Sequence, residues 1–292
     1  MVERRNPQPV ISKENDMTTS TATVLRRREP PGGASRPTQS SLPVLGGYTS
    51  DGEPAAAVFL WAATRFRDDF EYALHRHEGL EILTLVLQGA MGHYDTATGQ
   101  WAYLNAGDAQ LIRSGSGVSH IERGASGTRG FQIQFDPDYA AALEQEPSYT
   151  DYPAESFTAH LIGDALVTEL VGDGGPIEAR TEGLSVRRVA VPAGSRAELA
   201  VGPGRFTLAY LIDGAATVNG ASAAIDDVIS LGGADSLTAD ATAPADLLVV
   251  SLPASPSYEP RRLDPRELAG RGAPGGPGGF PGGGGGFGGG LQ

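Results

Sequence analysis

The chain has 292 residues and a formal net charge of −13 at pH 7, and 40% of its residues are apolar. That length is enough to bury a sizeable core, and the 41 glycines and 21 prolines favour a turn-rich β protein. The charge argues against direct binding to nucleic acid or to an anionic membrane, and the absence of cysteine excludes disulfides, zinc–thiolate sites and thiol nucleophiles.

No apolar run approaches the length of about 18 residues that a transmembrane helix needs, and the first residues lack the apolar stretch of a secretory signal. We therefore expect a cytoplasmic protein. Lys13 is the single lysine, and all other basic residues are arginines. Together with the abundance of alanine and glycine, this indicates a GC-rich bacterial genome and carries no information on function.

Both ends of the chain differ in composition from the rest. Residues 1–42 are polar, proline-rich and without periodicity, which predicts a disordered N-terminal tail. Within it, Met17 is a candidate for the true start, and the basic residues 26–28 are interpreted as a solvated charge cluster. Residues 263–292 are rich in glycine and proline and are expected to form a flexible tail.

A first β domain is expected over residues 43–150. Short apolar runs broken by Gly, Asn and Asp predict many strands. Residues 81–87 predict a buried strand, and residues 90–104 predict a β-hairpin with its turn at 95–99. Residues 131–135 alternate apolar and polar side chains, which is typical of a further strand of the same sheet.

A second β domain is expected over residues 151–262, after a connector at 138–160 with a short helix. Its segment 208–214 (LAYLIDG) can be laid on 83–89 (LTLVLQG), as an internal repeat requires. The chain is therefore expected to contain two related β units in tandem.

Two short motifs in the first β domain have the spacing of a metal site. His75 and His77 are one residue apart in a predicted strand, as are His120 and Glu122, so each pair lies on one face of its strand. If both strands line one barrel interior, three nitrogens and one oxygen meet there. Four such ligands suit an octahedral Fe(II) or Mn(II) with two open positions, whereas a structural zinc would close its tetrahedron.

Other candidate ligands are less well placed. Glu81 is the rival carboxylate, but in a straight strand it would lie about 13 Å from His77. We therefore favour Glu122 as the ligand and interpret Glu81 as a residue that supports the ligands or the fold. His93 is expected to be a hydrogen-bonded barrel histidine, and His160 a surface residue.

The second β domain has lost the candidate ligands. Laid on the repeat, His75, His77, His120 and Glu122 fall on non-ligand residues, namely Ala200, Gly202, Ala239 and Ala241. No histidine follows His160. The second unit is therefore predicted to be structural or pocket-forming, without metal ligands of its own.

The motifs resemble those of the pirin family. The resemblance lies in residues 75–89 (HRHEGLEILTLVLQG), 105–110 (NAGDAQ) and 114–122 (SGSGVSHIE), and is strong over residues 55–135. It implies an all-β bicupin with two tandem cupin barrels, iron in the N-terminal barrel and a degenerate C-terminal barrel. Where pirins usually carry Pro-His-Pro-His-Arg-Gly-Phe-Glu, this chain has Leu-His-Arg-His-Glu-Gly-Leu-Glu, so the ligand positions are kept while the pocket edge changes.

The resemblance also implies an activity. Family members with quercetin 2,3-dioxygenase activity suggest a metal-dependent dioxygenase that acts on a flavonol or a related aromatic enol, uses dioxygen, and releases a depside and carbon monoxide. Glu122 is expected to take the substrate's 3-hydroxyl proton, in addition to binding the metal. Fe(II) is the expected ion, with Mn(II), Ni(II), Co(II), Cu(II) and Zn(II) as alternatives.

Two other functions need the same four ligands. Some pirins are described as regulators, which suggests an iron-binding, redox-sensing protein that reports to a protein partner. A small-molecule-binding cupin without turnover is the third reading. The sequence leaves these alternatives open beside the dioxygenase.

Overall fold

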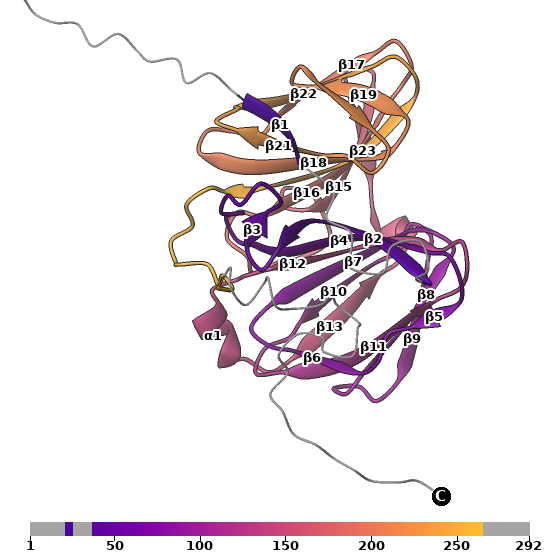
Figure 1. The fold of residues 1–292 in the computed structure, drawn as a ribbon, viewed down its shortest axis with the longest axis vertical. Helices are drawn as coiled ribbons and strands as arrows, with labels where there is room; N and C mark the ends of the chain where they lie inside the picture. The colour runs from indigo at the N-terminus through magenta and orange to yellow at the C-terminus, as the bar shows by residue number, and fades with distance from the viewer. Residues whose placement is uncertain (1–20, 26–36, 265–292) are drawn as a thin grey trace, which may run out of the picture.

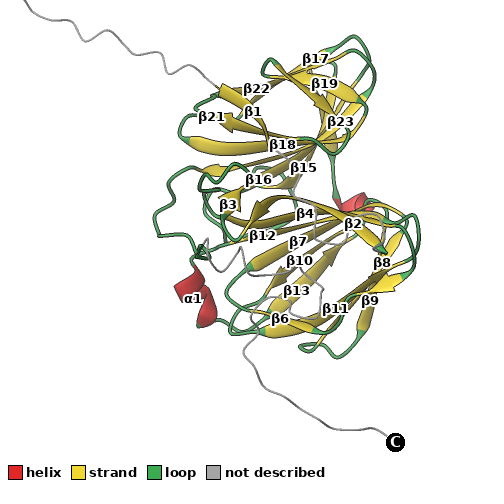
Figure 2. Cartoon of the chain, in the orientation of Figure 1, coloured by secondary structure: helices red, strands yellow, loops and turns green. Residues whose placement is uncertain are grey.

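The computed structural model describes residues 21–25 and 37–264, and these form two barrels of antiparallel strands (Figure 1). The described residues contain one short α-helix, α1 (Tyr139–Leu143), and one 3-10 turn at Ala154–Ser156 (Figure 2). Neither of these described helices is long or apolar enough to cross a membrane. Nearly all of the remaining regular structure is β, as expected from the composition.

Two sheets form the first barrel. In spatial order, the larger sheet consists of β13 (Ser148–Tyr152), β10 (Ala109–Arg113), β7 (Glu81–Gln88), β12 (Arg129–Phe135), β4 (Val58–Phe66), β2 (Thr38–Leu45) and β3 (Tyr48–Thr49). The smaller sheet consists of β5 (Phe70–Glu71), β11 (Val118–Gly124), β8 (Ala90–Asp95) and β9 (Trp101–Asn105), with β6 (His75–His77) also paired to β11.

The second barrel repeats this arrangement. Its larger sheet has the spatial order β1 (Thr21–Leu25), β21 (Val228–Gly232), β18 (Arg205–Asp213), β23 (Ala245–Pro253), β16 (Ser185–Val191), β15 (Ala165–Val171) and β14 (Ala159–Ile162). Its smaller sheet has the order β17 (Arg196–Ala200), β22 (Ser236–Ala241), β19 (Ala215–Val218) and β20 (Ala221–Ala224).

The largest hydrophobic core lies between the two barrels, where their larger sheets pack face to face (Figure 1). Trp61 and Phe131 from the first barrel meet Tyr210 from the second, with ring centroids 4.4 Å apart for Phe131 and Tyr210 and 6.2 Å apart for Trp61 and Tyr210. Such a shared core of aromatic and aliphatic side chains joins the two units into one body.

Strand β12 shows how side-chain alternation separates this core from the barrel interior. Phe131, Ile133 and Phe135 are buried in the core between the sheets. Gln132 and Gln134 point the other way, since Gln132 reaches β11 in the opposite sheet and Gln134 donates to Gln132 at 3.0 Å. The polar face of this strand therefore lines the first barrel and does not face solvent.

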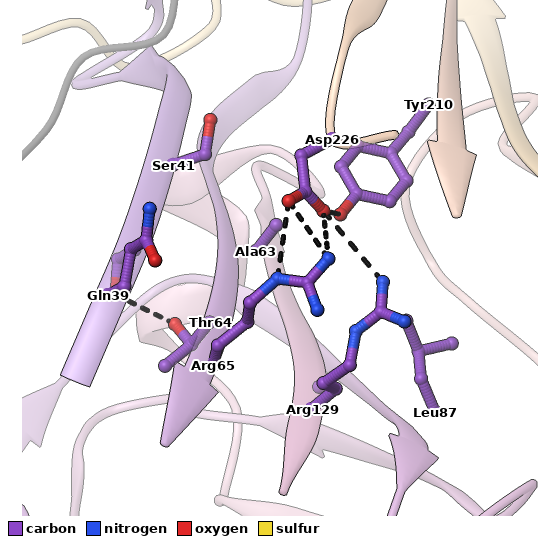
Figure 3. Close-up of a pocket in the computed structure, with 11 residues that line it drawn as sticks. Gln39, Ser41, Ala63, Thr64, Arg65, Leu87, Arg129, Tyr210 and Asp226 are labelled. Carbon is purple, nitrogen blue, oxygen red and sulfur yellow. Dashed lines mark hydrogen bonds and ion pairs between the residues drawn. The ribbon is translucent and has the colours of Figure 1, made fainter. Parts of the chain in front are cut away.

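An ion cluster ties the barrels together beside the shared core (Figure 3). Arg65 on β4 donates to both carboxylate oxygens of Asp226, which precedes β21, at 2.9–3.2 Å. The Tyr210 hydroxyl donates to the same carboxylate, and Arg129 lies 3.8 Å from it. These side chains line a pocket at the junction of the barrels, and none of the histidines is among its lining residues.

The prediction of a disordered tail over residues 1–42 is wrong where the structure describes this segment. Strand β1 pairs along its length with β21 of the second barrel, and β2 begins at Thr38 and pairs with β4. The partner strands lie elsewhere in the sequence, so the composition of residues 1–42 could not reveal them. Pairing with these strands satisfies the backbone N–H and C=O groups of the segment. Met17 and residues 26–28 lie outside the described residues.

The prediction of a flexible tail from residue 263 is wrong for its first residue. Leu263 is buried, and its backbone N–H donates to the Gly46 carbonyl at 3.0 Å. Residues 265–292, which carry the rest of that prediction, lie outside the described residues.

The strands predicted for the first barrel are confirmed. β7 covers the predicted buried strand, and β8 pairs with β9 as the predicted hairpin. The connector at 138–160 holds more structure than expected, because β13 pairs along its whole length with β10. The predicted boundary between residues 150 and 151 therefore lies inside a strand, and the domain limits 43–150 and 151–262 stay predictions.

Candidate metal centre

Strands β6 and β11 carry the predicted metal ligands and pair antiparallel, with His75 opposite His120. The chain leaves β6 for the other sheet through a turn at Gly79, which has a φ of 67°. A Cβ at this position would lie 2.3 Å from the Tyr139 ring, so the turn requires glycine. The turn ends β6 after three residues, and its pairing with β11 brings the two distant motifs together.

The side chains of His75, His77 and His120 converge inside the first barrel. One ring nitrogen of each lies within 4.8 Å of a ring nitrogen of the other two, and the Nε2 atoms of His75 and His120 are 2.8 Å apart. Two nitrogen ligands at right angles on one ion, each about 2.1 Å from it, lie about 3 Å apart. The observed spacing therefore fits two ligands of a common ion.

The hydrogen bonds of these histidines leave nitrogen lone pairs for a metal. The Nδ1 of His75 lies 2.8 Å from the Ala73 carbonyl, which can only accept, so Nδ1 carries the hydrogen and Nε2 a lone pair. The Nε2 of His77 is buried and has no hydrogen-bond partner. Leaving such an atom unpaired costs about 1–3 kcal/mol, and a divalent ion would satisfy it. The donor set fits a first-row transition metal.

Burial keeps the three imidazoles neutral, which is the state that binds metal. Desolvation lowers the pKa of His77 to about 3, with a further contribution from the nearby His75. Burial lowers the pKa of His120 well below its usual value, and lowers that of His75 as well. Near neutral pH none of the three rings therefore carries a positive charge that would repel an ion.

Glu122 lies on the same buried face of β11 as His120, two residues further along the strand. The group of converging ligand atoms consists of the three histidines without it. Its carboxylate instead accepts a hydrogen bond of 2.5 Å from the Nε2 of Gln132 on β12. Burial raises the pKa of Glu122 to about 7, although the hydrogen bond from Gln132 opposes this. Its role as a fourth ligand stays a prediction.

Glu81 supports the fold. Its carboxylate accepts hydrogen bonds from the backbone N–H groups of Arg180 at 2.8 Å and Thr181 at 2.9 Å, and from the Thr181 hydroxyl at 2.7 Å. Arg113 is 3.4 Å away. Glu81 therefore fastens the first barrel to the segment before β16. His160 is exposed on β14, as predicted.

His93 contacts the histidine cluster directly. Its Nε2 lies 3.2 Å from the Nδ1 of His120, and burial lowers its pKa to about 4. This agrees with the prediction of a hydrogen-bonded barrel histidine. Asp95 lies behind it, with Oδ2 4.0 Å from the Nδ1 of His93.

Sequence reasoning missed two residues beside the cluster, the buried Asp95 and the partly buried Gln132. The spacing of His93 and Asp95, one residue apart on a hairpin strand, was a signal for the first. The alternation of β12 was a signal for the second, but it does not reveal that the polar face is enclosed.

The second barrel has apolar residues at the matching positions, although the predicted matches of the first histidine pair are wrong. β17 pairs with β22 as β6 pairs with β11, and Ala239, which matches His120, lies opposite Ala197. The histidine pair therefore matches Ala197 and Leu199, and not Ala200 and Gly202. The repeat alignment shifted this strand because the connection that follows it is longer in the second barrel.

Comparison with known proteins gives related sequences. A family model described as Pirin matches residues 57–134. A Pseudomonas aeruginosa protein named "Putative quercetin 2,3-dioxygenase PA1210" is 31% identical over 206 residues, which cover 66% of this chain and 84% of that protein. A similarly named Zymomonas mobilis protein is 38% identical over 84 residues, which span 28% of this chain and 35% of that protein.

Solved structures show the same fold. The bacterial pirin YhhW from Escherichia coli, in complex with nickel(II), superposes with a TM-score of 0.65 at 19% identity, over 80% of this chain and 99% of that one. Quercetin 2,3-dioxygenase from Acinetobacter baumannii gives a TM-score of 0.66 at 18% identity, over 86% and 93% of the two chains. The predicted tandem pair of cupin barrels is confirmed.

Proposed function

This chain belongs to the pirin family, and we propose that it is a metal-dependent dioxygenase that oxidises a flavonol such as quercetin or a related aromatic enol. The observation that carries the proposal is the convergence of three neutral imidazoles, one of them with a buried and unpartnered Nε2. This convergence lies inside the segment that matches the family model. The names of the relatives supply the substrate class.

His75, His77 and His120 would hold the ion, with Glu122 as the proposed fourth ligand. When bound, the ion supplies Lewis-acid activation of the substrate hydroxyl and stabilises the negative charge that develops on its oxygen. We propose Fe(II), because imidazole and carboxylate ligands with open positions suit its oxygen chemistry. Mn(II), Ni(II), Co(II), Cu(II) and Zn(II) suit the same donors.

Glu122 is the proposed proton acceptor. A carboxylate next to the bound substrate can take the 3-hydroxyl proton and later release it. Gln132 holds the carboxylate in place, and Gln134 in turn holds Gln132. Proton removal makes the aromatic ring electron-rich enough to react with dioxygen, and the proposed products are a depside and carbon monoxide.

The barrel interior limits the access of water to the cluster. Ile82, Ile112 and Val118 form a buried apolar cluster, against which Tyr149 packs. Val118 lies opposite His77 in the β6–β11 pairing. Charge stabilisation is stronger where water is excluded in this way.

Elemental analysis of the purified protein, combined with oxygen uptake in the presence of quercetin, tests this proposal. We expect one metal ion per chain and uptake that stops when the ion is chelated. In Glu122→Gln, which keeps the size of the side chain, oxygen uptake should fall by about 100-fold or more. Glu198→Gln, an exposed position in the second barrel, is the matched control and should leave uptake unchanged.

Three results would contradict the proposal. Oxygen uptake that persists after chelation would show that the ion takes no part in the reaction. Full oxygen uptake in Glu122→Gln with the ion retained would show that Glu122 is not the proton acceptor. One bound ion without uptake, for quercetin and for other catechols and enols, favours the regulatory or ligand-binding alternatives.

A further inference from the structure

We propose that Asp95 and His93 are positioning residues for His120, and that both histidines change tautomer together when the ion binds. The inference rests on the proposed metal site and adds to it two residues that do not touch the ion. It starts from three buried atoms next to the cluster: the Nε2 of His93, which contacts His120, and two atoms behind it that lack partners.

The hydrogen bonds of the protein without metal fix one arrangement of hydrogens. The Nδ1–H of His75 donates to Ala73, so its Nε2 is an acceptor. The Nε2 of His120, 2.8 Å away, must then carry a hydrogen, which leaves the Nδ1 of His120 as an acceptor. His93 therefore donates to it through Nε2–H across 3.2 Å.

This arrangement explains the two unpartnered atoms. When the hydrogen of His93 is on Nε2, its Nδ1 carries a lone pair that faces the Oδ2 of Asp95. Two acceptors cannot form a hydrogen bond, and the two atoms lie 4.0 Å apart, both buried and without a partner.

Metal binding reverses the arrangement. A bound ion requires the lone pair of the His120 Nε2, so the hydrogen of His120 must move to Nδ1. That Nδ1–H can only be satisfied if the Nε2 of His93 becomes an acceptor, which places the hydrogen of His93 on Nδ1, toward Asp95. Each histidine keeps one hydrogen, so no proton is gained or lost. Metal-bound histidines usually donate their second N–H to a carboxylate or carbonyl in this way.

Asp95 is held ready for this role. Its Oδ1 accepts hydrogen bonds of 2.8 Å from the backbone N–H groups of Ala97 and Thr98, in the turn of the β8–β9 hairpin. Its Oδ2 is left over and lies on the side of His93. The turn therefore fixes the Asp95 carboxylate. Its Oδ2 accepts a hydrogen bond from His93 only in the metal-bound form, and we call this chain of hydrogen bonds from His120 through His93 to Asp95 the relay.

The direct test is nitrogen NMR on the full chain labelled with ¹⁵N-histidine, with Zn(II) as a diamagnetic probe. We expect His120 and His93 to carry hydrogen on Nε2 without metal, and on Nδ1 after one equivalent of zinc. A zinc-bound protein in which His93 keeps its hydrogen on Nε2 would overturn the relay.

Zinc affinity, measured by competition with a chelator, gives a second readout. His93→Leu should weaken zinc binding by about 10–100-fold, and His93→Gln, whose amide can either donate or accept, should restore most of it. His160→Leu, at an exposed histidine, is the matched control and should bind zinc as the parent does.

Asp95→Asn distinguishes a role of Asp95 in orienting His93 from a role in holding the hairpin turn. The amide keeps an oxygen for the hairpin turn and offers an N–H to the His93 lone pair, so the metal-free protein should melt at the same or a higher temperature. Zinc should bind about 10-fold more weakly, because that N–H opposes the Nδ1–H of the metal-bound form. Lower stability with unchanged zinc affinity would overturn the proposal.

The outcomes also separate this inference from the proposed function. If the parent protein binds no zinc or iron, both fail. Zinc binding without the tautomer change defeats the relay alone, and a tautomer change without oxygen uptake defeats the dioxygenase alone.

Discussion

The two barrels share one antiparallel frame and differ in what fills it. Six inward positions on three paired strands match between them by cross-strand register. In the first barrel they hold His75, His77, His93, Asp95, His120 and Glu122. In the second they hold Ala197, Leu199, Ala216, Val218, Ala239 and Ala241, all of which belong to one apolar core.

The difference shows that the fold does not need the polar set. The second barrel closes with an apolar interior, and none of its described residues in 159–253 has a buried side-chain nitrogen or oxygen without a partner. The first barrel leaves such atoms on His77, His93 and Asp95 at the histidine cluster, and also on residues away from it, such as Trp61 and Gln110. Buried polar atoms without partners destabilise a fold, and the three at the cluster are those that the proposed ion and hydrogen shift would satisfy.

The largest effect is expected when a metal-ligand candidate of the first barrel is replaced by the residue at the matching position of the second. His77→Leu copies Leu199, and we expect the metal content to fall to background because one of three imidazoles is lost. The metal-free protein should become more stable by about 1–3 kcal/mol, since an unpaired buried nitrogen is removed. Metal analysis and thermal unfolding after chelation measure both effects.

His160→Leu is the control for this substitution, because it removes an exposed histidine of the second barrel. It should change neither metal content nor melting temperature. Stoichiometric metal in His77→Leu would show that the ion lies elsewhere.

The reverse exchange should damage the second barrel. Leu199 is fully buried, and Leu199→His places an imidazole without partners in an apolar core, which should cost about 2–5 kcal/mol of unfolding free energy. No metal should be gained, because the neighbouring positions are alanines. Ala200→His, at the exposed next position of β17, should stay within about 0.5 kcal/mol in chemical denaturation. Equal losses of stability in Leu199→His and Ala200→His would mean that the interior of the second barrel tolerates a polar side chain.

Asp226→Asn tests how much the ion cluster between the barrels contributes to stability. This substitution removes the charge that pairs with Arg65 and Arg129 and accepts from Tyr210, and we expect a loss of about 2 kcal/mol in chemical denaturation. Asp240→Asn is the control, because its pair with Arg196 is exposed and should be worth less than about 1 kcal/mol. Equal losses would show that the cluster adds nothing to the shared core.

The histidine cluster of the first barrel should also make stability depend on pH. The folded pKa values of His77, about 3, and His93, about 4, lie below the unfolded value of 6.5. Between pH 4 and 6.5 the unfolded chain therefore binds more protons, and the stability of the metal-free protein is complete above pH 6.5 and falls as the pH falls.

Glu122 acts in the opposite direction, because its raised pKa favours folding at low pH and this contribution is lost as the pH rises through about 7. The lowered pKa values of His75 and His120 add to those of His77 and His93, so the histidines outweigh Glu122 and stability rises with pH near pH 5.5, by more than about 1 kcal/mol per pH unit. Denaturation of the chelated protein at several pH values measures the slope. It should be shallower in His77→Leu and steeper in Glu122→Gln, and a slope unchanged in both would contradict these assignments.

The sequence by itself determined which histidines form the cluster. His75, His77 and His120 were identified because alternation along a strand places residues two apart on one face, and such periodicity is local. The tandem β units and the loss of ligands in the second unit were also visible from internal similarity. The side chain of Glu122 was placed on the correct face, but its partner Gln132 was not foreseen.

Only the tertiary structure decided which strands meet. The pairing of β6 with β11, the match of His77 with Leu199, and the addition of β1 to the second barrel all depend on register between segments far apart in the chain. Glu81 finds its partner at Thr181, in the segment between β15 and β16 of the second barrel. Cross-strand hydrogen bonds set these contacts, so a pattern that repeats every two residues cannot specify the opposing strand. The same register brings Asp95 and His93 behind His120, and links the hairpin turn to the histidine cluster.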